Sequence, residues 1–340
     1  MRYIIFIKLI ISLQKNNFYR SSECINASID MGRSEYQNYD IEDCFFQRFA
    51  VFDDNGGVIY MNNLEKNIYA NQVVFFNCSV NNNDKKGGAM YFNNPNNECN
   101  LRKICALNCV AKEGHFAYIY AKTHNFSHIS IMKCSEYYIG WYSLYIESGN
   151  QSLTHINSSR NRADIWCAGI NFRYPISCFC SFSTFFSNEP RASAVIVYSN
   201  AFNVTHHCNV VNNSSPSYGI IVNEHSGNCS FQDCILYYNG NTLFNVCSGS
   251  ISIINCSISH SGETYGVYSV AYLFTQNVLN IQMRTFQIDF YSTEQCETYI
   301  HHPDQTPPHT PIRTYDENCP FSISQTNRLS VVFVIGALFY

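Results

Sequence analysis

The fold is decided by the stretch Asn77-Cys78-Ser79-Val80-Asn81 and the apolar run that follows it, Gly88-Ala89-Met90-Tyr91-Phe92. The first segment centres on a small thiol or hydroxyl residue with Asn close behind, and the apolar run comes 9 to 15 residues later. Such repetition at a period of 20–50 residues is typical of a solenoid. The thiol or hydroxyl position recurs at Cys44, Cys78, Cys109, Cys134, Ser158, Thr184, Cys208, Cys234 and Cys256. The apolar run recurs around Ile59, Met90, Tyr118, Leu144, Gly169, Val195, Ile220, Phe244 and Val267.

The spacing of the two series indicates which solenoid this is. Successive apolar runs lie 23 to 31 residues apart, and the thiol series keeps step with them. Leucine-rich repeats share this period but need a Leu-x-x-Leu-x-Leu framework, which is missing here. Paired-helix repeats are longer, so neither class fits. Strand-forming runs such as 194–198 alternate with turn-forming runs such as 81–84. The sequence therefore predicts an all-β, right-handed, single-stranded parallel β-helix of about nine coils over residues 40–272.

The nine thiol and hydroxyl positions are predicted to form one core ladder. In-register parallel strands place equivalent residues about 4.8 Å apart, so each coil's Cys would lie over the next. Cys packs as a small hydrophobe, and Ser158 and Thr184 are similar in size. Stacked Asn side chains are expected to hydrogen-bond along the axis. We expect mostly reduced thiols, with Cys178/Cys180 and Cys296/Cys319 as better disulfide candidates outside the ladder.

Composition excludes several partners. Charged residues make up 14% of the chain and the net charge is −4, which favours neither nucleic acid nor an anionic membrane surface. The 17 Cys include no Cys-x-x-Cys pair, so an extracellular location suits them better than zinc binding. The run His206-His207-Cys208 resembles a metal cluster, but neighbouring residues of a strand face opposite sides. We therefore predict no metal and no cofactor.

The two ends of the chain lack the clean repeat. Residues 1–39 are predicted to hold a signal peptide and an N-terminal cap, and residues 273–302 a C-terminal cap. A Pro-rich linker follows over 303–328. The apolar tail 329–340 is shorter than the ~20 residues that cross a bilayer. It is either a truncated membrane anchor or a soluble segment that docks on the solenoid.

Ten Asn-x-Ser/Thr triplets occur in the chain. If Cys78 and Cys256 point inward, Asn77 and Asn255 face outward on a tightly stacked sheet, where a glycan is disfavoured. Loop positions are better acceptors. The glycosylation candidates are therefore Asn125, Asn150, Asn212 and Asn213.

Many β-helices cleave acidic polysaccharides, and that chemistry needs clustered carboxylates or an Arg or Lys base on one face. Polygalacturonase-like enzymes carry Asp-Asp and Gly-His-Gly among their signatures. In this chain Asp53-Asp54 matches only a fragment of that set, and Gly114-His115-Phe116 differs from Gly-His-Gly at its last residue. The other acids are scattered about one per turn, so no catalytic residue is predicted. A tyrosine series could form a sugar-stacking stripe, although such rings more often stack on each other. Its members are Tyr118, Tyr120, Tyr137, Tyr138, Tyr142 and Tyr145.

With the Phe-x-x-Cys segment at Phe75 and the run Gly87-Gly88-Ala89-Met90-Tyr91-Phe92 in view, the chain resembles the parallel β-helix surface proteins. It is most similar to the large trichomonad-type families related to polymorphic outer-membrane proteins and to the pectin-lyase-like superfamily. The resemblance covers about residues 40–272 and rests on repeat style. It implies a secreted or surface-exposed protein, often with one C-terminal membrane span, which is incomplete here.

The function expected from these observations is non-enzymatic. We expect a surface-displayed or secreted β-helix whose long side contacts a host or matrix ligand, either a glycan or a protein. Membrane attachment would use the C-terminal tail, and no nucleic acid is expected as partner. Two alternatives stay open, a pectate-lyase-like carbohydrate-active enzyme and a structural coat protein. Fold alone does not choose among them.

Overall fold

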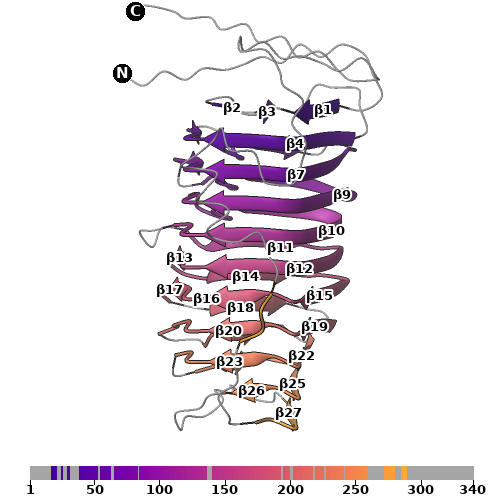
Figure 1. Ribbon diagram of the computed structural model, residues 1–340, viewed down its shortest axis with the longest axis vertical. Coiled ribbons are helices and arrows are strands. Elements are labelled where there is room, and N and C mark those ends of the chain that lie inside the picture. The colour runs from indigo at the N-terminus through magenta and orange to yellow at the C-terminus, as the bar shows by residue number, and fades with distance from the viewer. Residues whose placement is uncertain are drawn as a thin grey trace, which may run out of the picture.

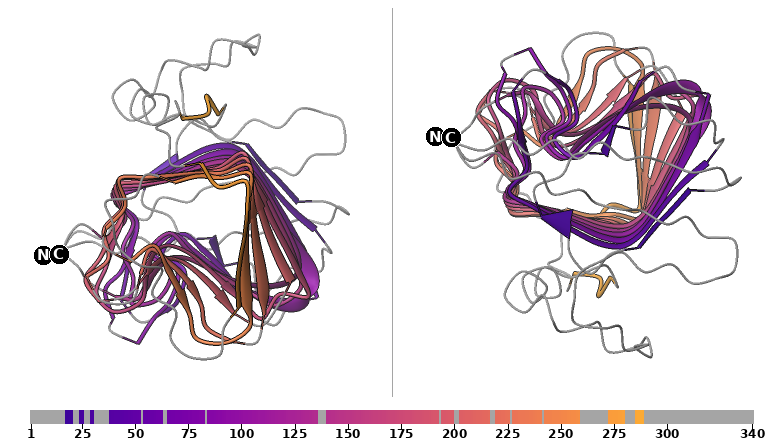
Figure 2. Two further views of the ribbon diagram at one scale, coloured as in Figure 1. Left: turned by 90° about the horizontal axis from the view of Figure 1, so that it is seen from below. Right: turned by 90° about the horizontal axis from the view of Figure 1, so that it is seen from above.

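In the computed structural model the strands stack in parallel above one another and form an elongated solenoid (Figure 1). Seen along the axis, the strands of successive turns superpose (Figure 2). No helix occurs among the described residues, so the all-β parallel solenoid predicted from the repeat is confirmed. The described residues are 17–20, 24–25, 29–30, 38–258, 272–279 and 285–288, with gaps at 53, 63–64, 83, 136–139, 193, 200–201, 217–218, 226 and 241.

Each turn contributes strand segments to three faces. Five long strands bend around a corner and serve more than one face: β4 (Asn38–Gln47), β7 (Asn67–Phe76), β9 (Met90–Leu107), β10 (Ala117–Met132) and β12 (Asn150–Ser159). Face 1 comprises the starts of β9 and β10 together with β3 (Ile29–Asp30), β6 (Ile59–Asn62), β11 (Tyr142–Glu147), β14 (Cys167–Arg173), β18 (Ala194–Ser199), β21 (Ile221–Asn223) and β24 (Phe244–Val246).

Faces 2 and 3 follow along the chain. Face 2 comprises the first halves of β4, β7 and β12, the middles of β9 and β10, and β1 (Asn17–Arg20), β15 (Ser177–Ser181), β19 (Phe202–His206), β22 (Asn228–Gln232), β25 (Ser250–Ile254) and β27 (Tyr272–Gln276). Face 3 comprises the ends of the five long strands and β2 (Cys24–Ile25), β16 (Thr184–Phe186), β20 (Asn209–Val211), β23 (Ile235–Tyr237) and β26 (Ser257–Ile258).

Two short pairs lie in the turns between faces 3 and 1. They are β5 (Ala50–Val51) with β8 (Ser79–Val80), and β13 (Arg162–Ala163) with β17 (Glu189–Pro190). Pairing also extends beyond residues 40–272, because β1–β3 pair with β4 and β6, and β27 pairs with β25. The remainder of the predicted N-terminal segment, the linker 303–328 and the tail 329–340 lie outside the described residues.

The corner between faces 2 and 3 is made by one residue per turn in the left-handed backbone region. In β7, for example, Ile68 and Ala70 alternate inward until Gln72, with φ 56°, turns the chain and Val73 points inward again. We call this series the first corner. It consists of Asp43, Gln72, Lys103, His128, His155, Phe182, His207, Asp233, Asn255 and Asn277. The residue after each points inward: Cys44, Val73, Ile104, Ile129, Ile156, Ser183, Cys208, Cys234 and Cys256.

A second corner of the same kind closes face 3. Its left-handed residues are Arg48, Asn77, Asn108, Lys133, Arg160, Ser187, Asn212 and Tyr238. The residue after each begins the turn that leads toward face 1. These following residues form a second stack of Phe49, Cys78, Cys109, Cys134, Asn161, Asn188, Asn213 and Asn239.

These registers correct the predicted single ladder. Cys44 pairs with Val73, not with Cys78, which stands five residues further along its own turn. Cys78, Cys109 and Cys134 therefore belong to the second corner, whereas Cys44, Cys208, Cys234 and Cys256 belong to the first. Ser158 pairs with Phe185 in the middle of face 3, and Thr184 pairs with Asn157 and Asn209 at its start. The single ladder was wrong because Cys follows a left-handed bend at both corners, at Cys44 and Cys208 in the first and at Cys78 and Cys109 in the second.

The inward residues of the second corner bind the backbone of the preceding turn. Asn188 Oδ1 accepts from the backbone N–H of Asn161 at 3.0 Å, and Asn188 Nδ2 donates to the carbonyl of Ser158 at 2.8 Å. The same two contacts recur at Asn161, Asn213 and Asn239. In the cysteine turns the thiol points at the equivalent carbonyl, as Cys109 Sγ does toward Phe75 O at 3.7 Å. The Asn stack expected from the sequence thus exists, as a continuation of the cysteine stack.

The cysteines of both corners are free and buried, as expected for packed thiols. Burial raises the pKa of the Cys109, Cys134 and Cys208 thiols well above the ordinary value, so they stay protonated. Cys178 and Cys180 are also free and buried, which corrects the disulfide predicted between them. Their side chains point inward on face 2, two residues apart on one strand. The Cys296/Cys319 pair lies outside the described residues.

Candidate functional site

The outer surface of face 2 loses its charges halfway along the solenoid. In the early turns it carries Asp40, Glu98 and Arg102. From β12 to β25 the outward residues are only neutral, apart from His206 at the edge. They are Asn150, Ser152, Thr154, Ser177, Phe179, Ser181, Phe202, Val204, His206, Asn228, Ser230, Gln232, Ser250, Ser252 and Ile254. Amides, hydroxyls and apolar side chains thus share one flat sheet surface.

Two neighbouring turns expose large apolar side chains on this surface. Phe179 in β15 is 44% exposed, Phe202 in β19 is 64% exposed, and Ile176 just before β15 is 73% exposed. The register that pairs Phe179 with Val204 places Phe202 opposite Ser177, two residues before Phe179, so the Cα atoms of the two phenylalanines stand roughly 8 Å apart. We call Ile176, Phe179, Phe202 and Val204 the face-2 patch.

Polar pairs border the face-2 patch along the axis. The Ser177 hydroxyl donates to Asn150 Oδ1 at 2.9 Å, and the Ser250 hydroxyl donates to Asn228 Oδ1 at 2.7 Å. These pairs are exposed, so their remaining hydrogen-bonding groups are available to a ligand. The surface combines ring faces with neutral hydrogen-bonding groups, a pattern that marks binding sites for neutral ligands.

The first corner carries a stack of rings beside the face-2 patch. His128 and His155 are parallel, with ring centroids 4.6 Å apart and an interplanar angle of 2°. His155 stacks on Phe182 at 5.5 Å, and Phe182 stacks on His207 at 5.3 Å. Phe286, from the chain beyond the solenoid, lies 5.4 Å from His207. One residue per turn in the same backbone conformation explains why the rings lie directly over each other.

The end of this stack gathers three possible metal ligands. His206 ends β19 and pairs with Gln232, so His207 and Asp233, the next residue of each turn, lie one above the other at the corner. His206 Nε2 lies 3.1 Å from Asp233 Oδ2, and His207 Nδ1 lies 2.9 Å from His206 Nε2. The prediction that His206 and His207 face opposite sides of the strand was therefore wrong. Strand alternation does not apply at His207, because its φ of 52° turns the chain and leaves both imidazoles outside. Cys208, by contrast, points into the core.

The chain beyond β27 returns to this corner. The Asn209 side chain donates from Nδ2 to the Phe286 carbonyl and accepts at Oδ1 from the Phe286 N–H, both at 3.0 Å. Residues 285–288 thereby lie outside the solenoid against face 3 (Figure 2). Nothing in the repeat signals this contact, because it joins residues 77 positions apart.

Of the tyrosines predicted as a stripe, Tyr118 and Tyr145 stack on each other and Tyr142 packs at an angle against Tyr145. Two further rings, Tyr60 and Tyr91, extend the stack. Tyr60, Tyr91, Tyr118 and Tyr145 follow one register on the outside of face 1, with centroids 4.4 to 5.6 Å apart. Tyr118 and Tyr145 both donate to the Glu147 carboxylate at 3.1 Å. Burial raises the pKa of Tyr118, Tyr142 and Tyr145. The rings are covered by neighbouring turns and are not available to a sugar. Tyr137 and Tyr138 lie outside the described residues.

The four glycosylation candidates divide into two groups. Asn125, Asn150 and Asn212 are exposed, the first two on strands β10 and β12 and not in loops. Asn213 is only 2% exposed, and its amide is held by the backbone of the preceding turn. The prediction of Asn213 as a glycosylation site was therefore wrong, because the residue after a left-handed bend points inward.

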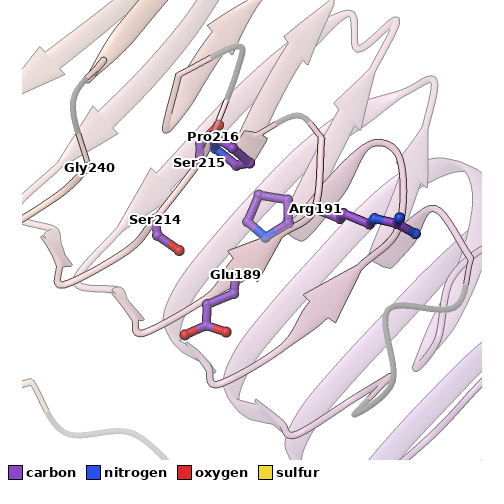
Figure 3. A pocket seen from close by; sticks show the side chains of 7 residues that line it. Glu189, Arg191, Ser214, Ser215, Pro216 and Gly240 are labelled. Atoms are coloured by element: carbon purple, nitrogen blue, oxygen red, sulfur yellow. The ribbon is translucent and has the colours of Figure 1, made fainter.

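A shallow depression of about 410 Å³ lies among the turns that follow face 3 (Figure 3). Glu189 and Arg191, which line it, point away from each other and pair with other residues. Arg162 Nε lies 3.3 Å from Glu189, and Arg191 Nη1 lies 3.2 Å from Asp164. These exposed pairs contribute little energy and present no acid and base to a common point. The depression resembles a gap between successive turns more than a catalytic cleft.

The near-miss catalytic segment contains His115, which is fully buried in the turn before face 1. Its Nδ1 accepts the Ala111 N–H at 3.2 Å, and burial lowers the pKa of His115 to about 3. A buried ring of this kind supports the turn and does not face solvent. Asp54 is described, but its neighbour Asp53 is not.

Among the described residues, no helix has the length and apolar character needed to cross a membrane. The chain matches no protein-family model, no curated protein and no solved structure. Its architecture defines it as a parallel β-solenoid protein.

Proposed function

We propose that this protein is a non-enzymatic, surface-displayed β-solenoid whose face-2 patch binds neutral glycans. The observation that carries the proposal is the exposure of Phe179 and Phe202 on adjacent turns of an otherwise polar, uncharged sheet. Isolated exposed apolar residues are ordinary, but rings gathered on one surface mark contact sites.

The chemistry of the surrounding side chains favours a sugar over a protein or an acidic polysaccharide. Ring faces pack against the apolar face of a sugar, and amides and hydroxyls such as those of Asn150, Ser177 and Asn228 pair with its hydroxyl groups. An acidic polysaccharide would need cations, and the outward positions from β12 to β25 offer no Lys or Arg. The flat surface also lets a chain molecule lie along the axis.

Surface display is supported by the repeat-style resemblance to β-helix surface proteins and by the exposed sequon at Asn212, which lies outside the strands. Cys105 is disulfide-bonded, which suits an oxidising compartment. Residues 329–340 are the candidate membrane attachment. Antibody labelling of unpermeabilised cells tests this part, and labelling only after permeabilisation would contradict it.

Replacing either ring of the face-2 patch should weaken glycan binding at least tenfold. The variants are Phe179→Ser and Phe202→Ser, because Ser152 and Ser177 hold the equivalent positions of the preceding turns and preserve the fold. Covering one ring is worth about 1.5–3 kcal/mol, and 1.4 kcal/mol is tenfold in affinity. The measurement is binding of the purified full chain to an array of neutral and acidic glycans.

The matched control is Tyr238→Asn. Tyr238 is 58% exposed but lies at the second corner, in a left-handed conformation that Asn accepts. Its binding should equal that of the unaltered protein. Binding to acidic glycans only would overturn the proposal. So would binding to cells that is lost when the cells are treated with protease but kept when they are treated with glycosidase. Release of reducing sugars from a bound glycan would contradict its non-enzymatic part.

A further inference from the structure

We propose that His206, His207 and Asp233 form a binding site for a divalent transition-metal ion of the zinc class at the first corner of the solenoid. One candidate ligand atom from each residue lies within 4.8 Å of the other two. The site is independent of the face-2 patch and of glycan binding.

The donor separations suit a metal with short bonds. Zinc binds imidazole nitrogen and carboxylate oxygen at about 2.0–2.2 Å, so two donors of a tetrahedral ion stand about 3.4 Å apart. The observed separations are 3.1 Å between His206 Nε2 and Asp233 Oδ2, and 2.9 Å between His207 Nδ1 and His206 Nε2. Small ring rotations would open these direct contacts to admit the ion.

The chemistry of the donors narrows the choice of metal. Two imidazoles and one carboxylate favour zinc, cobalt, nickel or copper over calcium and magnesium, which prefer all-oxygen sites. The side chains of His206 and Asp233 are 30% and 37% exposed. Three protein ligands on an open corner leave a fourth position for water or for a donor from a partner.

The backbone holds the donors in place. His207 and Asp233 occupy equivalent left-handed positions on successive turns, so their separation is set by strand pairing and not by a flexible loop. Phe182 stacks on one side of His207, and Phe286 lies against it as part of the segment tied to Asn209. The imidazole is therefore confined before any metal arrives, which reduces the entropy lost on binding.

The same corner provides an internal control. His128 and His155 also occupy successive turns, but their rings are parallel at 4.6 Å, and the neighbouring corner positions are Lys103 and Phe182. No carboxylate stands beside them in this register. His155→Asn therefore removes an imidazole from the same corner without touching the proposed site.

The test is titration of the full chain with Co(II) and with Zn(II). Asp233→Asn and His207→Asn each remove one ligand and should weaken binding at least tenfold, whereas His155→Asn should leave it unchanged. Both positions tolerate Asn, because Asn255 and Asn277 hold the next two rungs in the same left-handed conformation. Circular dichroism and thermal unfolding check that the variants retain the fold.

The Co(II) absorption spectrum separates this site from the cysteines. Nitrogen and oxygen ligands give visible d–d bands without the intense near-ultraviolet charge transfer of thiolates. We expect that spectrum for the unaltered chain and its loss in Asp233→Asn. Equal affinity of the unaltered chain and Asp233→Asn, a thiolate spectrum, or no binding of either ion would overturn the proposal.

Discussion

Lowering the pH from 7 to 5 should reduce the free energy of unfolding by about 4 kcal/mol. His115 and His124 are both fully buried, and burial lowers their pKa values to about 3 and about 4. In the unfolded chain each returns to about 6.5. The unfolded state therefore binds more protons below pH 6.5, and stability is lost as the pH falls from there toward the folded pKa values. Each histidine contributes about 2 kcal/mol at pH 5.

Chemical denaturation at pH 7, 6 and 5 measures this loss. The informative variant is His124→Gln, because Gln151 occupies the same inward position on the next turn. It should remove about half of the pH dependence. Burial raises the pKa of Asp40 above the ordinary 3.8, and this shift acts in the opposite sense. Equal stability at pH 7 and pH 5 would contradict the prediction.

Replacing Asn188 by Leu should cost about 3–5 kcal/mol. The side chain is fully buried and branches at Cγ as Leu does, so the replacement removes hydrogen bonds without leaving a cavity. The Asn161 N–H and the Ser158 carbonyl would lose their partners inside the second corner. Each unsatisfied buried group costs about 1–3 kcal/mol. The loss is measured as the change in the free energy of unfolding at pH 7.

Two comparisons make the result interpretable. Asn188→Cys recreates the residue type at Cys134 and keeps a weak donor to the carbonyl, so its loss should be smaller than that of Leu. Asn228→Ala removes an exposed amide that pairs with Ser250 and should cost less than about 1 kcal/mol. If Asn188→Leu and Asn228→Ala had the same effect, the buried stack would not stabilise the solenoid.

The candidate site was only partly foreseeable. The apolar runs and turn residues predict the parallel stack, and the absence of Asp, Glu, Lys and Arg from 150–159 and 174–188 is visible in the sequence. The convergence of His206, His207 and Asp233 was missed because strand alternation was applied across His207. A signal existed, since the first-corner residue of the next two turns is Asp233 and then Asn255, both residue types that accept the left-handed region.

The return of residues 285–288 to face 3 could not be found from the repeat. Its two hydrogen bonds join Asn209 to the backbone of Phe286, and a backbone contact leaves no pattern in the side chains. Likewise, the covering of the tyrosine stack on face 1 depends on how the turns between faces 3 and 1 fold over it. These turns vary in length and composition from one coil to the next.

By itself the sequence determined that like segments stack in parallel, because apolar runs and small polar residues recur in step over most of the chain. Tertiary structure decided which residues become vertical neighbours. Each of the two corners puts a left-handed residue before an inward side chain, and that side chain is Cys in some turns of both corners, so local chemistry cannot tell Cys44 from Cys78. Backbone hydrogen bonding between whole turns selects one register, and that register alone separates the two stacks and brings His207 over Asp233.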